Sequence, residues 1–148
     1  MKNVLTILFL FFGFAQNPKA QNVNNDFIVI DVSIPDAEQI KAQYSGQAGV
    51  YVILASQVKA PVQIAEALNG KQVTDLHLFV SAKPGTLGFC NMALNPETIQ
   101  EQASALSQWK FHVSGNVVIH NSDVFISQRG LDFKAKLEQV TGLTFLVQ

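Results

Sequence analysis

Side chains that could support hydrolysis follow two apolar stretches of the sequence. Ser122 stands two residues after His120, and Ser81 and Lys83 follow the apolar run that ends at Val80. A serine hydroxyl becomes a strong nucleophile only when a general base lies within hydrogen-bond reach. His120 could be that base, and so could Lys83 if burial kept its amine neutral. These residue types therefore allow a hydrolase, although no third group that would orient the imidazole is evident.

Metal and thiol chemistry have less support in the sequence. The histidines His77, His112 and His120 are spread without the spacing of a metal site, and His120 with Asp123 would supply only two ligands. His77 lies inside an apolar run and is interpreted as a hydrogen-bonded core histidine. Cys90 has no cysteine partner, so we interpret it as a buried small hydrophobe, with an intermolecular thiol or a site residue as alternatives. We expect neither a metal nor a cofactor.

Short apolar segments alternate with helical patterns along the chain. The β-rich segments are residues 27–32, 50–54, 75–80, 117–119 and 143–147. Such near-continuous apolar runs are typical of strands buried on both faces of a parallel sheet. The apolar stripes between them are Ala37-Ile40-Tyr44, Ile64-Ala65-Leu68, Ile99-Ala103-Leu106 and Phe133-Leu137-Val140. The alternation predicts a three-layer α/β sandwich with a mainly parallel sheet, and residues 87–94 predict a small added β-hairpin.

Capping and turn residues predict where the helices begin and end. Pro61 can open one helix, and Asn95-Pro96-Glu97 supplies a cap, a first-turn proline and a first-turn acid for another. Gly46, Gly70 and Gly142 follow three of the stripes and are expected to end those helices.

Polar side chains stand at the ends of three predicted strands. In open α/β sheets, ligands bind beyond the carboxyl ends of the strands, where the strand order reverses. Asp31 stands near the end of the first strand, Ser81 and Lys83 follow the third, and His120 and Ser122 follow the fourth. We therefore expect these five side chains to gather on one rim of the sheet and to bind a ligand there.

The first twenty residues resemble an export signal. Residues 1–20 contain Lys2 and Lys19, no acidic residue, and a twelve-residue apolar stretch from Val4 to Ala15. That stretch is shorter than the roughly 20 residues that cross a bilayer. Small residues favour cleavage after residue 20, or alternatively between residues 15 and 16. We expect a secreted or periplasmic protein whose residues 21–148 form one domain without a membrane span; a buried strand or a membrane anchor is the alternative.

Composition excludes several classes of protein. Hydrophobic residues make up 48% of the chain, which is ordinary for a globular protein, and charged residues make up 14%, which is below the average of about 25%. Such a chain is too apolar to be disordered. Residues 21–148 hold 8 basic and 11 acidic residues, a net charge of −3, so we expect no nucleic-acid partner. No glycine-rich phosphate loop is present, and Arg129-Gly130 is only a weak indication of an anion site.

Several blocks of the sequence resemble an uncharacterised bacterial caspase-like domain family. They are residues 27–36, 63–68, 77–85 and 115–124, with Gly130, Phe133, Leu137 and Thr141-Gly142 near the end. In that family the third strand reads His-x-x-Ser-His-Gly-x-Pro-Gly, and the fourth reads roughly Gly-x-x-x-x-Tyr-Gly-Cys-x-Val. The family occurs in large surface proteins, often near adhesin or cadherin-type repeats. The resemblance implies a caspase-like (clan CD type) fold in which a histidine and a cysteine form a catalytic dyad.

Both dyad positions are replaced in this chain. With His77 and Pro84-Gly85 aligned, Ser81 stands at the histidine position, and Ser122 stands at the cysteine position. A hydroxyl cannot accept and return a proton near neutral pH as imidazole does, and thiolate chemistry is lost. The resemblance therefore implies a non-catalytic pseudoenzyme that binds an unknown protein or peptide at the bacterial cell envelope. The alternatives are a hydrolase with Ser122 as nucleophile and a purely structural envelope protein.

Overall fold

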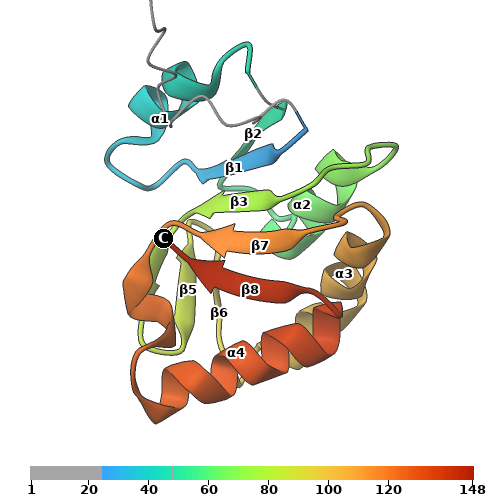
Figure 1. Ribbon diagram of the computed structural model, residues 1–148. Helices are drawn as coiled ribbons and strands as arrows, with labels where there is room; N and C mark the ends of the chain where they lie inside the picture. Colours follow the sequence, from blue (N-terminus) through green and yellow to red (C-terminus); the bar gives the residue numbers. More distant parts are fainter. Residues whose placement is uncertain (1–24, 48) are drawn as a thin grey trace, which may run out of the picture.

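Five short strands, each parallel to its neighbours, form the central sheet (Figure 1). The structure is a computed structural model and describes residues 25–47 and 49–148. The strands are β1 (Phe27–Asp31), β2 (Gly49–Ile53), β3 (Leu76–Phe79), β7 (Asn116–Ile119) and β8 (Thr144–Val147). With helices on both faces, this sheet confirms the predicted α/β fold. The predicted signal peptide, residues 1–20, lies outside the described residues.

The order of the strands places a topological switch point beside the predicted site. The order is β2-β1-β3-β7-β8, so the chain first adds β2 on one side of β1 and then crosses to build the other side. All five residues of β1 are buried, which explains why an apolar run with no polar face became a central strand. The strand order reverses between β1 and β3, and a ligand is expected beyond their carboxyl ends.

Apolar stripes on the helices cover the sheet. The helices are α1 (Ala37–Tyr44), α2 (Ala60–Leu68), α3 (Ala103–Gln108) and α4 (Ser127–Thr141), with short 3₁₀ segments η1 (Ile99–Gln102), η2 (Trp109–Phe111) and η3 (Ser122–Phe125). Helix α1 packs against Ile28 and Ile30 on one face. Ile64 of α2, Leu106 of α3 and Phe133 of α4 join the larger core on the other face. No helix among the described residues is long and apolar enough to cross a membrane.

The third helix begins later than its cap residue predicts. The Asn95 side chain does accept hydrogen bonds from the backbone N–H groups of Glu97 and Thr98, each at 3.0 Å. These bonds close a turn rather than an α-helix, and the chain passes through η1 before α3 starts at Ala103. Asparagine side chains form such local turns readily, and this explains the difference.

A second, antiparallel sheet follows β3. Its strands are β4 (Ser81–Lys83), β5 (Thr86–Phe89) and β6 (Met92–Leu94), in the order β4-β5-β6. The predicted hairpin over residues 87–94 is confirmed as β5 and β6, because the apolar side chains of that segment alternate. Leu87, Phe89 and Leu94 pack into the core. The sequence did not predict β4, whose polar residues show no apolar alternation.

Candidate functional site: two pockets that share Ser81

Two pockets lie where β3 passes into the small sheet, and Ser81 borders both. The small-sheet pocket has a volume of about 430 Å³, and its polar lining residues are Ser81, Lys83, Thr86, Asn95 and Arg129. The rim pocket has a volume of about 270 Å³ and is lined by residues that include Asp36, Phe79, Ser81, His120 and Asn121. Of the predicted residues, Ser81 and Lys83 line the small-sheet pocket, and Ser81 and His120 line the rim pocket.

Strand register explains the shape of the small-sheet pocket. Ser81 lies opposite Gly88, and Gly88 lies opposite Ala93, so three small residues stand side by side across β4, β5 and β6. Partners in register point to the same face of a sheet. Because none of these side chains is large, the open face of the small sheet is hollow, while Leu87 and Leu94 fill the core on its other face.

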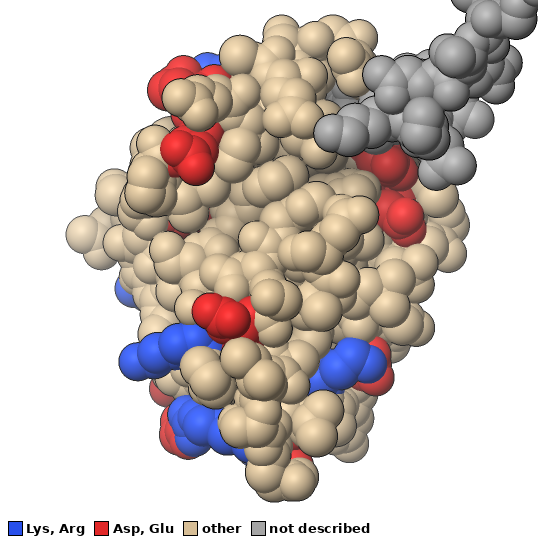
Figure 2. All heavy atoms as spheres, turned by 60° about the vertical axis from the view of Figure 1, so that its left-hand side comes forward, with Lys and Arg blue, Asp and Glu red and all other residues tan. Residues whose placement is uncertain are grey.

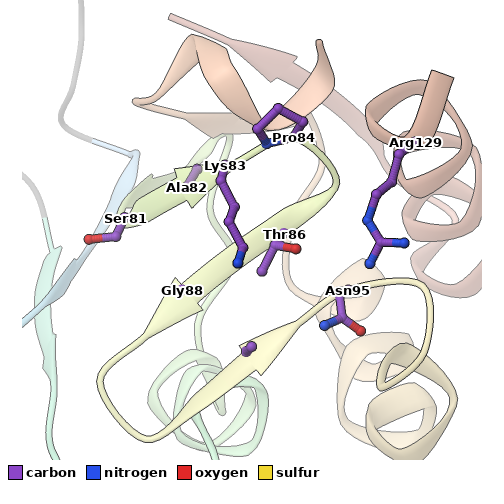
Figure 3. A pocket seen from close by; sticks show the side chains of 9 residues that line it. Ser81, Ala82, Lys83, Pro84, Thr86, Gly88, Asn95 and Arg129 are labelled. Atoms are coloured by element: carbon purple, nitrogen blue, oxygen red, sulfur yellow. The ribbon is translucent and has the colours of Figure 1, made fainter. Parts of the chain in front are cut away.

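Two basic side chains border this pocket. In Figure 3, Lys83 and Arg129 extend toward the space between them, and the Ser81 hydroxyl points away from both. Arg129 donates two hydrogen bonds to Glu97, at 2.9 and 2.7 Å, and these bonds lower the pKa of the Glu97 carboxyl. Lys83 is exposed and takes part in none of the ion pairs found within residues 25–47 and 49–148. Its ammonium group is therefore available to an anionic ligand.

The charges on this side of the molecule are unevenly spread. Figure 2 shows that Lys and Arg side chains gather in the lower part of the view, with acidic side chains beside some of them. The middle of the view carries few charged side chains, and acidic side chains lie at the upper left and at the right. This face therefore carries charges of both signs.

One histidine of the rim pocket, His120, contacts a second histidine, His77, outside it. His120 stacks on Phe79 with ring centroids 3.9 Å apart, and its Nε2 atom lies 2.8 Å from Nδ1 of His77. Burial, and then the neighbouring His77, lower the pKa of His120 to about 4. The imidazole of His120 is therefore neutral at neutral pH. It binds another histidine, whereas a catalytic base would have to contact a nucleophile.

Asp31 is fully buried at the end of β1 and is used internally. Its Oδ2 atom accepts a hydrogen bond from the backbone N–H of Cys90 at 2.8 Å, and its Oδ1 atom accepts bonds from the N–H and hydroxyl of Ser33. It lines neither pocket. Its carboxylate ties β1 to the end of β5 and so holds the small sheet against the central one.

Cys90 is a half-buried thiol that packs against the core. Burial and the carboxylate of Asp31 raise the pKa of the thiol, so it is protonated at neutral pH. A thiol is a much weaker nucleophile than a thiolate. The environment agrees with the interpretation of Cys90 as a small hydrophobe, although the residue is only partly buried.

Ser122 is exposed at the start of η3 and borders neither pocket. Asn121 caps η3 by accepting a hydrogen bond from the N–H of Asp123 at 3.1 Å, and the tight turn carries Ser122 outward. Within the described residues no hydrogen bond joins the Ser122 side chain to His120 or Lys83. The structure thus places Ser81 with Lys83 in one pocket and with His120 in the other, and it separates Asp31 and Ser122 from both.

The sequence prediction did not identify every polar residue of these pockets. Thr86 and Asn95 join Lys83 only because β4, β5 and β6 lie side by side. Arg129 was noted as a weak anion signal, and it enters the small-sheet pocket from α4. A turn motif before β5, Pro84-Gly85, was the available sign that a further strand precedes the hairpin.

A third group of side chains could hold a metal ion. Asp26, Asp75 and His77 each offer one ligand atom, and the three atoms lie within 4.8 Å of one another. The interpretation of His77 as a hydrogen-bonded core histidine holds for Nδ1, whereas its buried Nε2 atom has no hydrogen-bond partner in the part of the chain that the structure describes. Asp123, the other acid considered beside a histidine, is exposed and outside this group.

Comparison with known families gives one match. A family model described as a domain of unknown function (DUF4347) matches residues 27–147. No curated protein matches the chain. No solved structure matches it either.

Proposed function

The chain belongs to the DUF4347 family of domains of unknown function, and on this premise we propose that it is an exported, non-catalytic domain that binds an acidic protein segment in the small-sheet pocket. The observation that carries the proposal is the position of Lys83. Its ammonium group borders a pocket of about 430 Å³ and has no ion-pair partner within the described residues. A carboxylate bound there would form a charge-assisted hydrogen bond.

The small sheet also offers backbone groups to a partner. Within the described residues, strands β4 and β6 each pair only with β5, so each has one outer edge that pairs with no strand, and η3 lies against β4. An extended polypeptide can add a strand to such an edge, and the main-chain bonds then supply affinity. The small residues Gly88 and Ala93 leave room beside that edge for the side chains of the added strand. A polypeptide with acidic residues matches these features better than a small apolar ligand.

We propose that the chain is not catalytic because Ser81 and Ser122 stand where the resembling family has its catalytic residues. The resemblance to caspase-like domains places a histidine at Ser81 and a cysteine at Ser122, and we propose that this chain retains a caspase-like scaffold without that dyad. Ser122 contacts no base within the described residues, which supports the proposal. The neutral thiol of Cys90 supports it as well, since its raised pKa disfavours thiolate chemistry.

Export and a place at the cell envelope are proposed from the sequence alone. The basic start and short apolar stretch of residues 1–20 favour a cleaved signal peptide. Determination of the amino-terminal residue of the protein recovered outside the cytoplasm tests this part. We expect the chain to begin at residue 16 or 21, and an intact Met1 would contradict it.

Binding can be tested with a fluorescently labelled hexaglutamate peptide and the full chain. We expect fluorescence anisotropy to show saturable binding that weakens at least tenfold in Lys83→Glu. The matched control is Lys71→Glu, which makes the same charge change at an exposed residue outside the pocket and should bind like the wild type. Equal affinities of the two variants would contradict binding at Lys83.

The hydrolase alternative has its own experiment. The wild-type chain and Ser122→Ala are incubated with a broad peptide library, and the products are identified by mass spectrometry. We expect no cleavage beyond that seen in buffer alone. Cleavage by the wild type that disappears in Ser122→Ala would overturn the non-catalytic proposal.

A further inference from the structure

Three ionisable side chains converge at the amino ends of β1 and β3. Asp26 directly precedes β1, Asp75 directly precedes β3, and His77 is the second residue of β3. Asp75 and His77 are two residues apart along an extended chain, so they point to the same face of the sheet. His77 lies in register with Ile28, which packs on the α1 face. One ligand atom from each lies within 4.8 Å of those of the other two.

Backbone and side-chain hydrogen bonds hold these ligands in place. Oδ1 of Asp26 accepts a bond from the N–H of Asp75 at 3.1 Å, and Oδ1 of Asp75 accepts one from the N–H of Asn116 at 2.7 Å. Nδ1 of His77 lies 2.8 Å from Nε2 of His120. Each of the three side chains therefore has one atom held by one of these contacts and a second atom that no hydrogen bond within the described residues occupies. Outer contacts of this kind orient the ligands of metal sites.

The geometry around the second ring nitrogen of His77, Nε2, fits a bound metal ion. This Nε2 atom is buried, has no hydrogen-bond partner among residues 25–47 and 49–148, and lies 3.4 Å from Oδ2 of Asp26. An N–H···O hydrogen bond is normally about 2.7–3.2 Å long, so this separation is too great for a good one. A tetrahedral zinc ion with bonds of about 2.1 Å holds neighbouring ligand atoms about 3.4 Å apart. We propose that Asp26, Asp75 and His77 bind a zinc ion.

The chemistry of the ligands favours zinc over the common hard cations. Imidazole nitrogen suits zinc and related transition metals, whereas calcium and magnesium select oxygen ligands in larger numbers. Three protein ligands with water in the fourth position make a typical open zinc site. The side chains of Asp26 and His77 are only 13% and 14% exposed. A divalent cation there would neutralise two carboxylates that the fold has placed side by side.

The zinc ion would determine which nitrogen of His120 carries its proton. A metal on Nε2 of His77 leaves the ring proton on Nδ1, which then donates to Nε2 of His120. Without the metal, His77 directs its Nε2–H toward Asp26, and its Nδ1 accepts the Nε2–H of His120. When zinc binds, His77 releases its Nε2 proton to solvent and accepts the Nε2 proton of His120 at its own Nδ1. His120 then takes a proton from solvent at Nδ1. The number of protons bound by the two histidines together is therefore unchanged. Because His120 borders the rim pocket, zinc sets that pocket's hydrogen-bonding character.

Isothermal titration calorimetry of the full chain, freed of metal with EDTA and dialysed, tests the site. We expect one equivalent of zinc chloride to bind and calcium chloride to give no heat of binding. Asp26→Asn and Asp75→Asn should each weaken zinc binding at least tenfold. An asparagine keeps the Oδ1 that accepts the backbone bond, so both variants should unfold in EDTA at a temperature close to that of the wild type. His112→Gln is the control, because His112 lies outside the site and should bind zinc normally.

Nitrogen NMR of the histidine rings provides a readout that does not depend on affinity. We expect zinc to shift Nε2 of His77 to a metal-bound value and to place the ring protons of His77 and His120 on Nδ1. Nε2 of His77 remaining protonated at saturation would overturn the proposal. Unchanged zinc affinity in both asparagine variants would overturn it as well. Neither result bears on the peptide assay, so the two proposals fail separately.

Discussion

Nδ1 of His77 lies 2.8 Å from Nε2 of His120, and this contact joins β3 to the turn that follows β7. Strands β3 and β7 are adjacent and parallel, and His120, which directly follows β7, also stacks on Phe79. The contact links the cluster of Asp26, Asp75 and His77 at the amino ends of the strands to the rim pocket at their carboxyl ends. A half-buried imidazole at such a junction makes the fold sensitive to pH.

His120 should make the folded protein less stable as the pH is lowered. Its pKa in the folded protein is about 4, below the unfolded value near 6.5, since burial and His77 disfavour the charged ring. A lowered pKa contributes stability that is present above about pH 6.5 and lost as the pH falls through about 4. We expect the free energy of unfolding, measured with urea in EDTA, to fall less between about pH 7.5 and about pH 4.5 in His120→Gln than in the wild type. Equal losses would contradict this assignment.

Asp31→Asn should destabilise the fold by about 2–3 kcal/mol. The carboxylate is fully buried and accepts bonds from Cys90 and Ser33, and an amide group would turn one acceptor into a donor that faces an N–H. Asp123→Asn makes the same change at an exposed residue and should cost less than about 0.5 kcal/mol. Urea unfolding measures both, and similar costs would show that the Asp31 bonds contribute little.

Gly85→Ala should cost more stability than Gly70→Ala. Both glycines have positive φ, +72° and +76°, so both substitutions carry the strain of a left-handed L-residue. A Cβ at Gly85 would also lie 2.6 Å from Cγ and 3.0 Å from the carbonyl oxygen of Arg129, whereas a Cβ at Gly70 meets nothing within 4 Å. We expect the Gly85 variant to lose at least about 1 kcal/mol more in thermal unfolding. An equal loss would mean that the β4–β5 turn can move away from α4.

The Cys90 thiol should react slowly in the folded protein. Burial and the Asp31 carboxylate raise its pKa, which reduces the thiolate fraction at neutral pH. We expect a disulfide reagent that releases a coloured thiol to modify Cys90 at least tenfold more slowly in buffer than in urea. A rate as fast as that of the unfolded chain would instead indicate an activated cysteine.

The elements of this fold could be predicted because their signals are local. Apolar runs such as residues 27–32 and 75–80 have no polar face, so they predict strands inside the sheet. Phe133 and Leu137 lie on one face of a helix, and both are buried. Gly70 and Gly142 adopt the left-handed conformation expected of residues that end helices. Local periodicity and backbone preference were therefore sufficient to predict the central sheet and the helices.

The arrangement of the polar side chains was decided by tertiary contacts. His77 and His120 are 43 residues apart in the chain, and Asp26 and Asp75 are 49 apart, so no local pattern relates them. Strand order predicts that strand ends meet, but not where their last side chains point. One short turn of η3 carries Ser122 away from the pockets. The sequence by itself determined the layers, whereas strand register, burial and the geometry of single turns decided which polar groups can act together.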